Sequence, residues 1–248
     1  NIDEGVTFDV ICGAEARTHW YVDTTGSDAS GSGTLASPLS SIQTAINATT
    51  DGDTVSVAAG TYVENINFSG KNIAVIGADS SNTIIDGDSS GTVVVFSGTE
   101  TSTALLKNFK IQNGYDDSND GVGGIYCADG ANPTLENLIV SDNIDDFGGN
   151  GAGGISVAPG TGDTLRIMGS AIRNNSGIWG GGGLLIQGDQ TGVTLLTNVY
   201  IENNTSNSGG GIMIDGGVAI LDSVTIMNNT AGSGNITENI GGGGIDIS

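Results

Sequence analysis

Two acidic segments in the middle of the chain carry the residues best suited to bind a metal ion. The first has the pattern Asp-x-Ser-x-Asp-Gly at residues 116–121, in which side chains with oxygen atoms alternate and a glycine closes the turn. This pattern is typical of a calcium loop, although the distant bidentate glutamate of an EF-hand is missing. The alternative interpretation is a solvated acidic turn. The predicted calcium ligands are Asp116, Ser118, Asp120, Asp142, Asp145 and Asp146.

Acidic residues greatly outnumber basic ones. The chain has 28 Asp and Glu against 6 Lys and Arg, which gives a formal net charge of −22. Because nucleic acids and anionic membranes are held by clustered Lys and Arg, this charge argues against both as partners. No apolar stretch is long enough to insert into a membrane, and no secretion signal opens the chain. The charge indicates solubility or, more specifically, carboxylates that gather calcium.

One pattern recurs from residue 105 onward. Large aliphatic residues form a column at Ile111, Val140, Ile172, Ile201 and Ile226. A second column lies five residues earlier, at Leu106, Leu135, Ile167, Leu196 and Leu221. Asn or Asp follows the first column after two residues and predicts a turn, because these residues tolerate left-handed backbone conformations. A Gly-Gly pair then precedes another aliphatic column at Ile125, Ile155, Leu184, Ile212 and Ile245.

Each repeat is predicted to form one coil of a parallel β-helix. A single unit has too little apolar surface to bury itself, so its strands must pack in register on those of the next unit. Equivalent side chains then stack about 4.8 Å apart, and aligned asparagines can form amide ladders. We therefore interpret the Asn columns as scaffold. The 43 glycines, without a 3.6-residue apolar stripe, argue against a helical solenoid.

Residues 20–87 are predicted to form an N-terminal cap and the first coils. Pro38 and the residues after it favour a short amphipathic helix with Ile42, Ala45 and Ile46 on its inner face. Such a helix would cover the first coil, whose strand groups would otherwise stay unpaired. Strands are expected at 53–57, 65–68, 72–77 and 83–87. Residues 88–248 are assigned to the β-helix repeats and residues 1–19 to an N-terminal extension.

The N-terminal part also contains a set of short turn and core motifs, namely Tyr21-Val22, Gly26-Ser27-Asp28, Ser37-Pro38, Ile42–Ile46, Gly52–Val55 and Gly60–Glu64. Together they closely resemble the start of secreted pectate-lyase-like right-handed β-helix proteins. Residues 113–143 resemble repeats in large bacterial surface and secreted proteins of that superfamily. The resemblance implies an all-β, right-handed parallel β-helix with a short N-terminal capping helix, located outside a bacterial cell or on its surface.

Enzymes of this architecture need residues that the sequence largely lacks. Gly60–Glu64 resembles the first motif of pectin methylesterases, but no later motifs supply the catalytic aspartates and arginine. Polygalacturonase-like hydrolysis needs paired carboxylates with a nearby histidine, and the only histidine, His19, lies outside the repeats. Lyases need a base and positive charge near the substrate carboxylate. Arg166 and Arg173 are interpreted as solvated surface charges, so a lyase would depend on other coils or loops.

These observations favour a non-enzymatic extracellular β-helix module of a larger secreted or surface protein, acting as a stalk, adhesin or glycan-contacting surface. The alternative is a polysaccharide lyase or glycoside hydrolase, and a further alternative is a filament-forming subunit that associates end to end. The expected partner is a polysaccharide or cell-surface glycan, and the expected cofactor is calcium. Cys12 and Cys127 either pair or remain buried thiols. Because the repeat is still running at Ser248, we expect more chain or another molecule beyond it.

Overall fold

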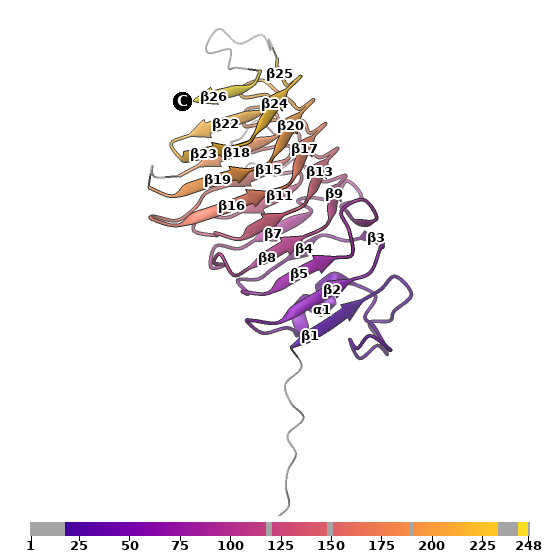
Figure 1. Cartoon of the computed structure of the whole chain (residues 1–248). Helices are drawn as coiled ribbons and strands as arrows, with labels where there is room; N and C mark the ends of the chain where they lie inside the picture. Colours follow the sequence, from indigo (N-terminus) through magenta and orange to yellow (C-terminus); the bar gives the residue numbers. More distant parts are fainter. Residues whose placement is uncertain (1–17, 118–120, 148–150, 189–190, 233–242, 248) are drawn as a thin grey trace, which may run out of the picture.

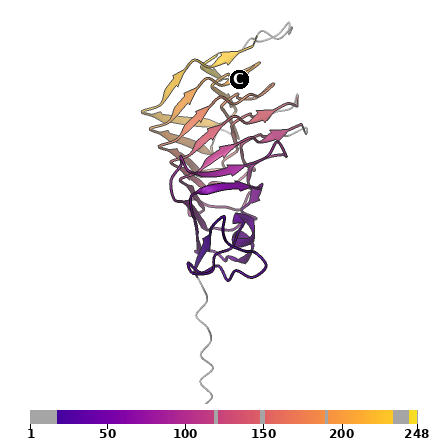
Figure 2. The same ribbon diagram turned by 90° about the vertical axis from the view of Figure 1, so that its right-hand side faces the viewer.

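The computed structural model describes residues 18–117, 121–147, 151–188, 191–232 and 243–247. Over these ranges the chain winds into a stack of coils, and each coil adds short strands to long parallel sheets (Figures 1 and 2). The helix α1 (Ile42–Ala48) lies at the N-terminal end of the stack (Figure 1). This arrangement confirms the predicted parallel β-helix with a short capping helix.

Three long sheets run along the stack. Sheet A contains β1 (His19–Val22), β2 (Thr54–Val57), β5 (Ala74–Gly77), β8 (Leu105–Lys107), β12 (Thr134–Glu136), β16 (Thr164–Met168), β19 (Val193–Thr197) and β23 (Val218–Asp222). Sheet B contains β3 (Gly60–Val63), β6 (Thr83–Asp86), β9 (Lys110–Gln112), β13 (Ile139–Ser141), β17 (Ala171–Arg173), β20 (Tyr200–Glu202) and β24 (Thr225–Met227). Sheet C contains β4 (Ile66–Asn67), β7 (Val94–Phe96), β11 (Ile125–Cys127), β15 (Ile155–Val157), β18 (Leu184–Gln187), β22 (Ile212–Asp215) and β26 (Ile245–Ile247).

Short ladders continue beyond sheet B on the side where loops project. They contain β10 (Tyr115–Asp116), β14 (Ile144–Asp145), β21 (Thr205–Ser206) and β25 (Thr230–Ala231). A coil therefore passes from sheet A to sheet B, through this short ladder and a loop, and then to sheet C. The corner after sheet B uses the left-handed backbone predicted for its Asn and Asp residues, with positive φ at Asn113, Asp142, Asn174, Asn203 and Asn228.

The predicted aliphatic columns are register partners on adjacent strands. In sheet A they are Leu106, Leu135, Ile167, Leu196 and Leu221, and in sheet B they are Ile111, Val140, Ile172, Ile201 and Ile226. These side chains are fully buried as far as Leu196 and Ile201, whereas Leu221 in the last turn is 40% exposed. Association through this end of the stack stays a prediction.

A buried asparagine ladder lies just inside the corner after sheet B. In each of three steps, the Nδ2 of one asparagine donates to the Oδ1 of the next at 3.0 Å. Each Nδ2 also donates to a strand carbonyl of the preceding coil. The ladder consists of Asn143, Asn175, Asn204 and Asn229. The interpretation of this column as scaffold is therefore confirmed.

The Gly-Gly anchors leave room for this ladder. A Cβ atom on Gly154 would lie 2.3 Å from the carbonyl oxygen of Gly183 in the next coil and 3.1 Å from Nδ2 of Asn175. Only glycine fits at that separation, since real Cβ atoms do not approach a backbone oxygen so closely. The repeated glycine is therefore a consequence of coil stacking and indicates no ligand.

Charged side chains hold the capping helix at both ends. The carboxylate of Glu64 accepts the backbone N–H groups of Ile42 at 2.8 Å and Gln43 at 2.9 Å. At the other end, the Nζ of Lys71 donates to the carbonyls of Ile46 at 2.6 Å and Thr49 at 2.8 Å. The negative charge of Glu64 and the positive charge of Lys71 suit the helix dipole, which favours an anion at the N-terminus and a cation at the C-terminus. The motif that ends at Glu64 thus anchors the cap.

We expect Lys71→Met to weaken the cap while preserving the aliphatic stem of the side chain. The loss of the ammonium removes its bonds to the carbonyls at the end of the helix and should lower the free energy of unfolding by about 1–2 kcal/mol. Chemical denaturation checks this value. Lys107→Met is the matched control, because Lys107 pairs with Glu136 on the surface and such pairs contribute about 0–1 kcal/mol. Equal losses in both variants would contradict a capping role.

Cys127 lies inside the coil stack. It is fully buried as a free thiol, and burial raises its pKa well above the usual range. Such a thiol stays protonated and unreactive in the folded protein. Cys12 lies outside the described residues, so the state of its own thiol stays a prediction.

Candidate functional site

The loop-bearing side of the stack brings several predicted ligands together. β10 and β14 pair in parallel, with Tyr115 opposite Ile144 and Asp116 opposite Asp145. The backbone N–H of Asp146 donates to the Asp116 carbonyl at 2.9 Å, and its carboxylate accepts the Tyr115 hydroxyl at 2.8 Å. We call these five residues the acidic ladder. Neighbouring coils thus place Asp116 beside Asp145.

Asp145 is the most deeply buried member of the acidic ladder, with 2% exposure. Its Oδ1 accepts the backbone N–H of Phe147 at 3.1 Å, whereas its buried Oδ2 has no hydrogen-bond partner among the described residues. Burial raises the pKa of Asp145 to about 6. The backbone N–H groups of Phe147 and Ile178 act in the opposite direction, and the charges of Asp116 and Asp146 raise the pKa further. A buried carboxylate in this setting needs a proton or a counter-charge.

The other predicted ligands lie elsewhere or are not described. The carboxylate of Asp142 accepts the Ser141 hydroxyl at 2.8 Å and lies 3.9 Å from the Lys110 ammonium, at the corner after sheet B. Ser118 and Asp120 are outside the described residues. Within the part of the chain that is described, no three His, Cys, Asp or Glu side chains lie together in a way that could hold a metal. Calcium binding by the full predicted set stays a prediction.

A polar groove crosses the corner between sheets C and A. Its volume is about 330 Å³, and its lining residues lie within 98–102, 130–132 and 162–166. These segments precede or enter β8, β12 and β16, so the groove spans three successive coils. Hydroxyl groups line much of it, from Thr99, Thr101, Ser102 and Thr164. The groove therefore offers both hydrogen-bond donors and acceptors.

Two charged residues and a buried amide complete the groove. Asn132 is 5% exposed, and its Nδ2 donates to Asp163 at 3.1 Å. The Oδ1 of Asn132 is buried behind the wall and has no hydrogen-bond partner in the described ranges. Arg166 donates from Nη1 to the Thr164 carbonyl at 3.1 Å, which fixes its guanidinium at the edge.

Glu100 holds the wall of the groove in shape. It is 1% exposed, and its Oε1 accepts the backbone N–H groups of Gly70 at 2.8 Å and Ser97 at 3.0 Å. Its Oε2 accepts those of Gly98 at 2.9 Å and Thr99 at 3.2 Å. One carboxylate therefore satisfies four backbone donors from two coils, and this arrangement makes it a structural residue.

The sequence did not reveal this groove. Arg166 was interpreted as a solvated surface charge, but it is partly buried in the groove wall. Glu100, Asn132 and Asp163 lie in loops of different length, so they fall in no repeat column. The only signal was a run rich in Gly, Ser and Thr before β8, which reads as an ordinary turn.

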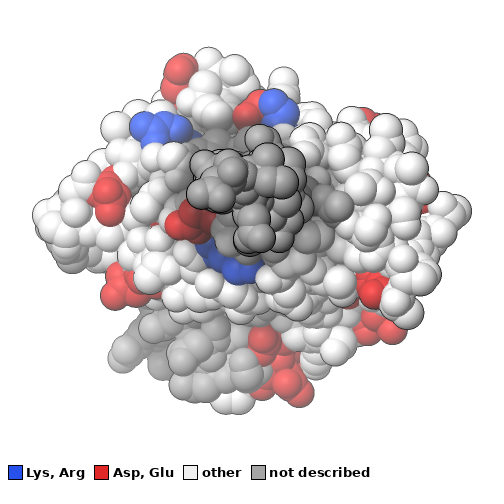
Figure 3. Space-filling model, turned by 90° about the horizontal axis from the view of Figure 1, so that it is seen from below, with Lys and Arg blue, Asp and Glu red and all other residues white. Residues whose placement is uncertain are grey.

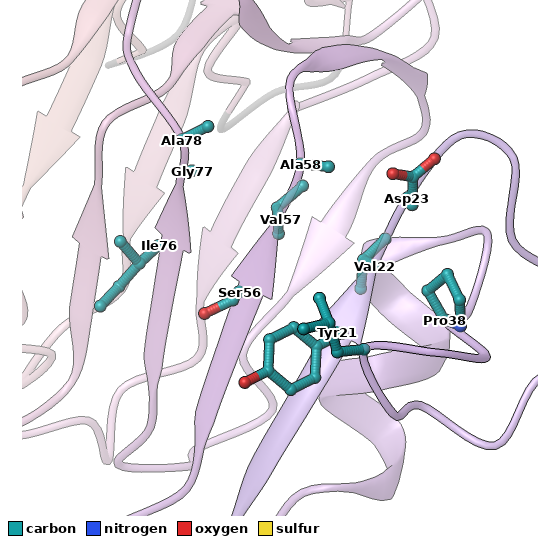
Figure 4. Close-up of a pocket in the computed structure, with 11 residues that line it drawn as sticks. Tyr21, Val22, Asp23, Pro38, Ser56, Val57, Ala58, Ile76, Gly77 and Ala78 are labelled. Atoms are coloured by element: carbon teal, nitrogen blue, oxygen red, sulfur yellow. The ribbon is translucent and has the colours of Figure 1, made fainter.

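A second hollow, mainly apolar and about 290 Å³ in volume, lies over the first strands of sheet A (Figure 4). The ring of Tyr21 lies at its edge and stacks on His19 with 4.6 Å between ring centroids. Asp23 also lines it, but its carboxylate already accepts the backbone N–H of Thr25 at 2.8 Å and its hydroxyl at 2.7 Å. The polar groove is therefore the better candidate for a polar ligand.

Acidic side chains outnumber basic ones on the face at the N-terminal end (Figure 3). Viewed onto the N-terminal end, several acidic groups lie around the rim and only a few basic ones are visible (Figure 3). This distribution agrees with the net charge of −22. Among the described helices, none has the length and hydropathy needed to span a membrane.

The three stacked parallel sheets define the chain as a parallel β-helix protein. No protein-family model matches the sequence, and no curated protein matches it significantly. A solved pectin methylesterase from carrot is similar with a TM-score of 0.45 and 14% identity, over 82% of this chain and 63% of that one. A pectin methylesterase from Aspergillus niger gives a TM-score of 0.39 and 15% identity, over 91% and 89%. The chain thus spans less than two thirds of the carrot enzyme.

Proposed function

We propose that this chain is a glycan-binding module of a secreted or cell-surface protein and that the polar groove holds the glycan. The observation that supports this proposal most directly is the composition of the groove. Hydroxyl, amide, carboxylate and guanidinium groups from three coils line one depression of about 330 Å³. Ligand sites commonly have volumes of about 300–1,000 Å³ and orient their ligand with a few placed polar groups.

The repeat of the coils suits a polymer. Successive coils are about 4.8 Å apart, which is close to the length that one pyranose ring adds to an extended polysaccharide. A glycan lying along the stack axis would therefore meet the loops of successive coils with successive rings. The hydroxyls of Thr99 and Thr164 and the guanidinium of Arg166 line the groove, and we expect them to bond the hydroxyl groups of the glycan.

The expected ligand is a neutral glycan. Arg166 is the basic residue of the groove, and Asp163 and Glu100 line the same depression. With a net charge of −22, the whole chain repels a uronate polymer over the range of the Debye length, about 8 Å at physiological salt. A neutral polysaccharide meets no such barrier.

An enzyme remains the second candidate because of the acidic ladder. Asp116 and Asp145 are register partners, and closely spaced carboxyl pairs are what glycosidases use to break glycosidic bonds. However, Asp145 is 2% exposed, so its carboxyl does not reach a polymer in this arrangement. We therefore favour binding over hydrolysis.

The test is a titration of the full chain with neutral oligosaccharides (glucan, mannan, galactan and xylan fragments) and with oligogalacturonate. We expect at least one neutral series to bind and oligogalacturonate to bind at least tenfold more weakly, measured by calorimetry. Arg166→Met should weaken neutral binding about tenfold, the effect of losing one or two hydrogen bonds. Arg173→Met, on the outer face of sheet B, is the matched control.

Two outcomes would reject the groove as the binding site. One is the same affinity in Arg166→Met and Arg173→Met, and the other is no measurable binding by any neutral fragment. Products that accumulate in the same mixtures, detected as new reducing ends or unsaturated uronates, would support the enzyme instead. Loss of those products in Asp116→Asn would then assign the activity to the acidic ladder.

A further inference from the structure

We infer that a calcium ion binds between two coils at the acidic ladder, held by the carboxylates of Asp116 and Asp145 and the carbonyl of Gly121. The site uses two of the six ligands predicted from the sequence, one from each of two neighbouring coils, together with one backbone carbonyl. It is also independent of the groove, which lies at another corner of the coil. Its role is to join the two neighbouring coils that contain β10 and β14.

The inference rests on an oxygen atom without a partner. Asp145 is 2% exposed, and its Oδ2 is fully buried without a hydrogen bond in the described ranges. Desolvating a carboxylate without compensation is costly, so a buried carboxylate is normally paired, protonated or bound to a metal. Here the nearest charged groups, Asp116 and Asp146, are also acidic. A cation bound here offsets the charge of Asp145 and reduces its repulsion from both neighbours.

Two glycines bring further oxygen atoms to the same place. A Cβ on Gly151 would lie 2.8 Å from Oδ2 of Asp145 and 1.8 Å from the carbonyl oxygen of Gly121, so both oxygens border one point. A Cβ on Gly121 would lie 2.7 Å from Oδ1 of Asp116. Each of the two neighbouring coils therefore packs a carboxylate against a glycine at the equivalent position. Side chains larger than hydrogen would displace these oxygens.

The arrangement is confined to these two coils. In the next coil the ladder continues through Ser176, which bridges to Ile144, and the residue after it is Gly177. The position that Asp116 and Asp145 occupy in their coils is therefore a glycine in the next coil. Carboxylates occupy this position in two adjacent coils and not in the next one. A general need for acidic residues on this surface does not explain that restriction.

The oxygen chemistry favours calcium over magnesium. Calcium accepts six to eight oxygen ligands in flexible geometry at about 2.3–2.6 Å, including carboxylates, backbone carbonyls and water. Magnesium requires near-ideal octahedral geometry and keeps several waters, which suits a crowded position between coils poorly. Two carboxylates also balance the charge of one Ca²⁺.

The experiment is thermal unfolding of the EDTA-treated chain, titrated with CaCl₂ or MgCl₂ up to about ten times the dissociation constant. For the natural sequence we expect Ca²⁺ to raise Tm by about 3–6 °C and Mg²⁺ to raise it by less than half as much. Asp116→Asn and Asp145→Asn should lose the calcium response. In EDTA, Asp145→Asn should be at least as stable as the natural chain, because it removes an unpaired buried charge.

Asp142→Asn is the control, since Asp142 lies beside Lys110 and outside the inferred site. It should keep the full calcium shift. The inference fails if calcium gives no shift in the natural chain, or an equal shift in Asp116→Asn. Equal shifts by Ca²⁺ and Mg²⁺ would also overturn it, because general screening of surface charge predicts that result.

Discussion

Replacing Glu100 with alanine is expected to lower the free energy of unfolding by about 3–5 kcal/mol. The change removes the acceptor of four backbone N–H groups, from Gly70, Ser97, Gly98 and Thr99. A buried donor left unsatisfied costs about 1–3 kcal/mol, and water entering the space will offset part of the sum. Urea denaturation of the full chain measures the loss.

Glu100→Gln separates hydrogen bonding from side-chain volume. The amide keeps one acceptor oxygen, but its NH₂ group then faces two N–H donors. We expect a loss of about 2 kcal/mol, between the natural chain and Glu100→Ala. Glu202→Ala is the matched control, because Glu202 lies partly exposed on the outer face of sheet B, and its loss should stay within about 0.5 kcal/mol. If Glu100→Ala lowers the free energy of unfolding no more than Glu202→Ala does, the four hydrogen bonds do not stabilise the fold.

The contrast between Glu100 and the aliphatic columns shows which features of this fold are readable from the sequence. Leu106 and Leu135 recur at equivalent positions because each coil must place an apolar side chain on the one below. Repetition in space therefore appears as repetition in sequence. Glu100 satisfies a loop that occurs once, so no column contains it.

The cap illustrates a second limit. The spacing of Ile42, Ala45 and Ile46 predicted the helix and its buried face, and the structure confirms both. The sequence did not indicate that Glu64 and Lys71 would bind the two ends of the helix, because both residues are distant from the helix in the chain. Contacts between segments that are distant in the chain need the fold first and cannot be read from local pattern.

The candidate sites were likewise predictable from the sequence only in part. The repeat gives the two acidic segments equivalent positions in neighbouring coils, and the structure places Asp116 and Asp145 in register. The burial of Asp145 was not expected, since an acidic loop normally faces water. It follows from Gly151, which packs against the carboxylate without a side chain of its own. The polar groove, assembled from three loops of different length, had no sequence pattern to predict it.

The asparagine ladder leads to the second large effect, at Asn175. Its Oδ1 accepts both the backbone N–H of Asn143 at 3.1 Å and its Nδ2 at 3.0 Å, and its own Nδ2 donates to Val140 at 3.0 Å and Asn204 at 3.0 Å. The residue is 1% exposed, so water does not replace these bonds. Asn175→Ala should lower the free energy of unfolding by about 3 kcal/mol.

Asn175→Asp should lower the free energy of unfolding by more than Asn175→Ala does, and the size of this loss should depend on pH. The aspartate places oxygen where Nδ2 faced two acceptors, and burial disfavours its charged form, so its pKa in the folded chain is raised above the ordinary value of about 3.9. The folded state then binds more protons than the unfolded state. Stability relative to Asn175→Ala should therefore fall as the pH rises above about 4 and level off above the raised pKa. Urea midpoints measured from pH 4 to pH 8 test this slope.

Asn174 provides the control within the same turn. It precedes Asn175, is exposed, and has a φ of 56°, so Asn174→Gly removes the side chain without straining the backbone. We expect a change of a few tenths of a kcal/mol, since an exposed amide has water as an alternative partner. Similar losses at both positions would mean that the asparagines act through turn conformation alone. A large loss confined to Asn175 would show that amide bonding between coils, and not the turn, holds the stack in register.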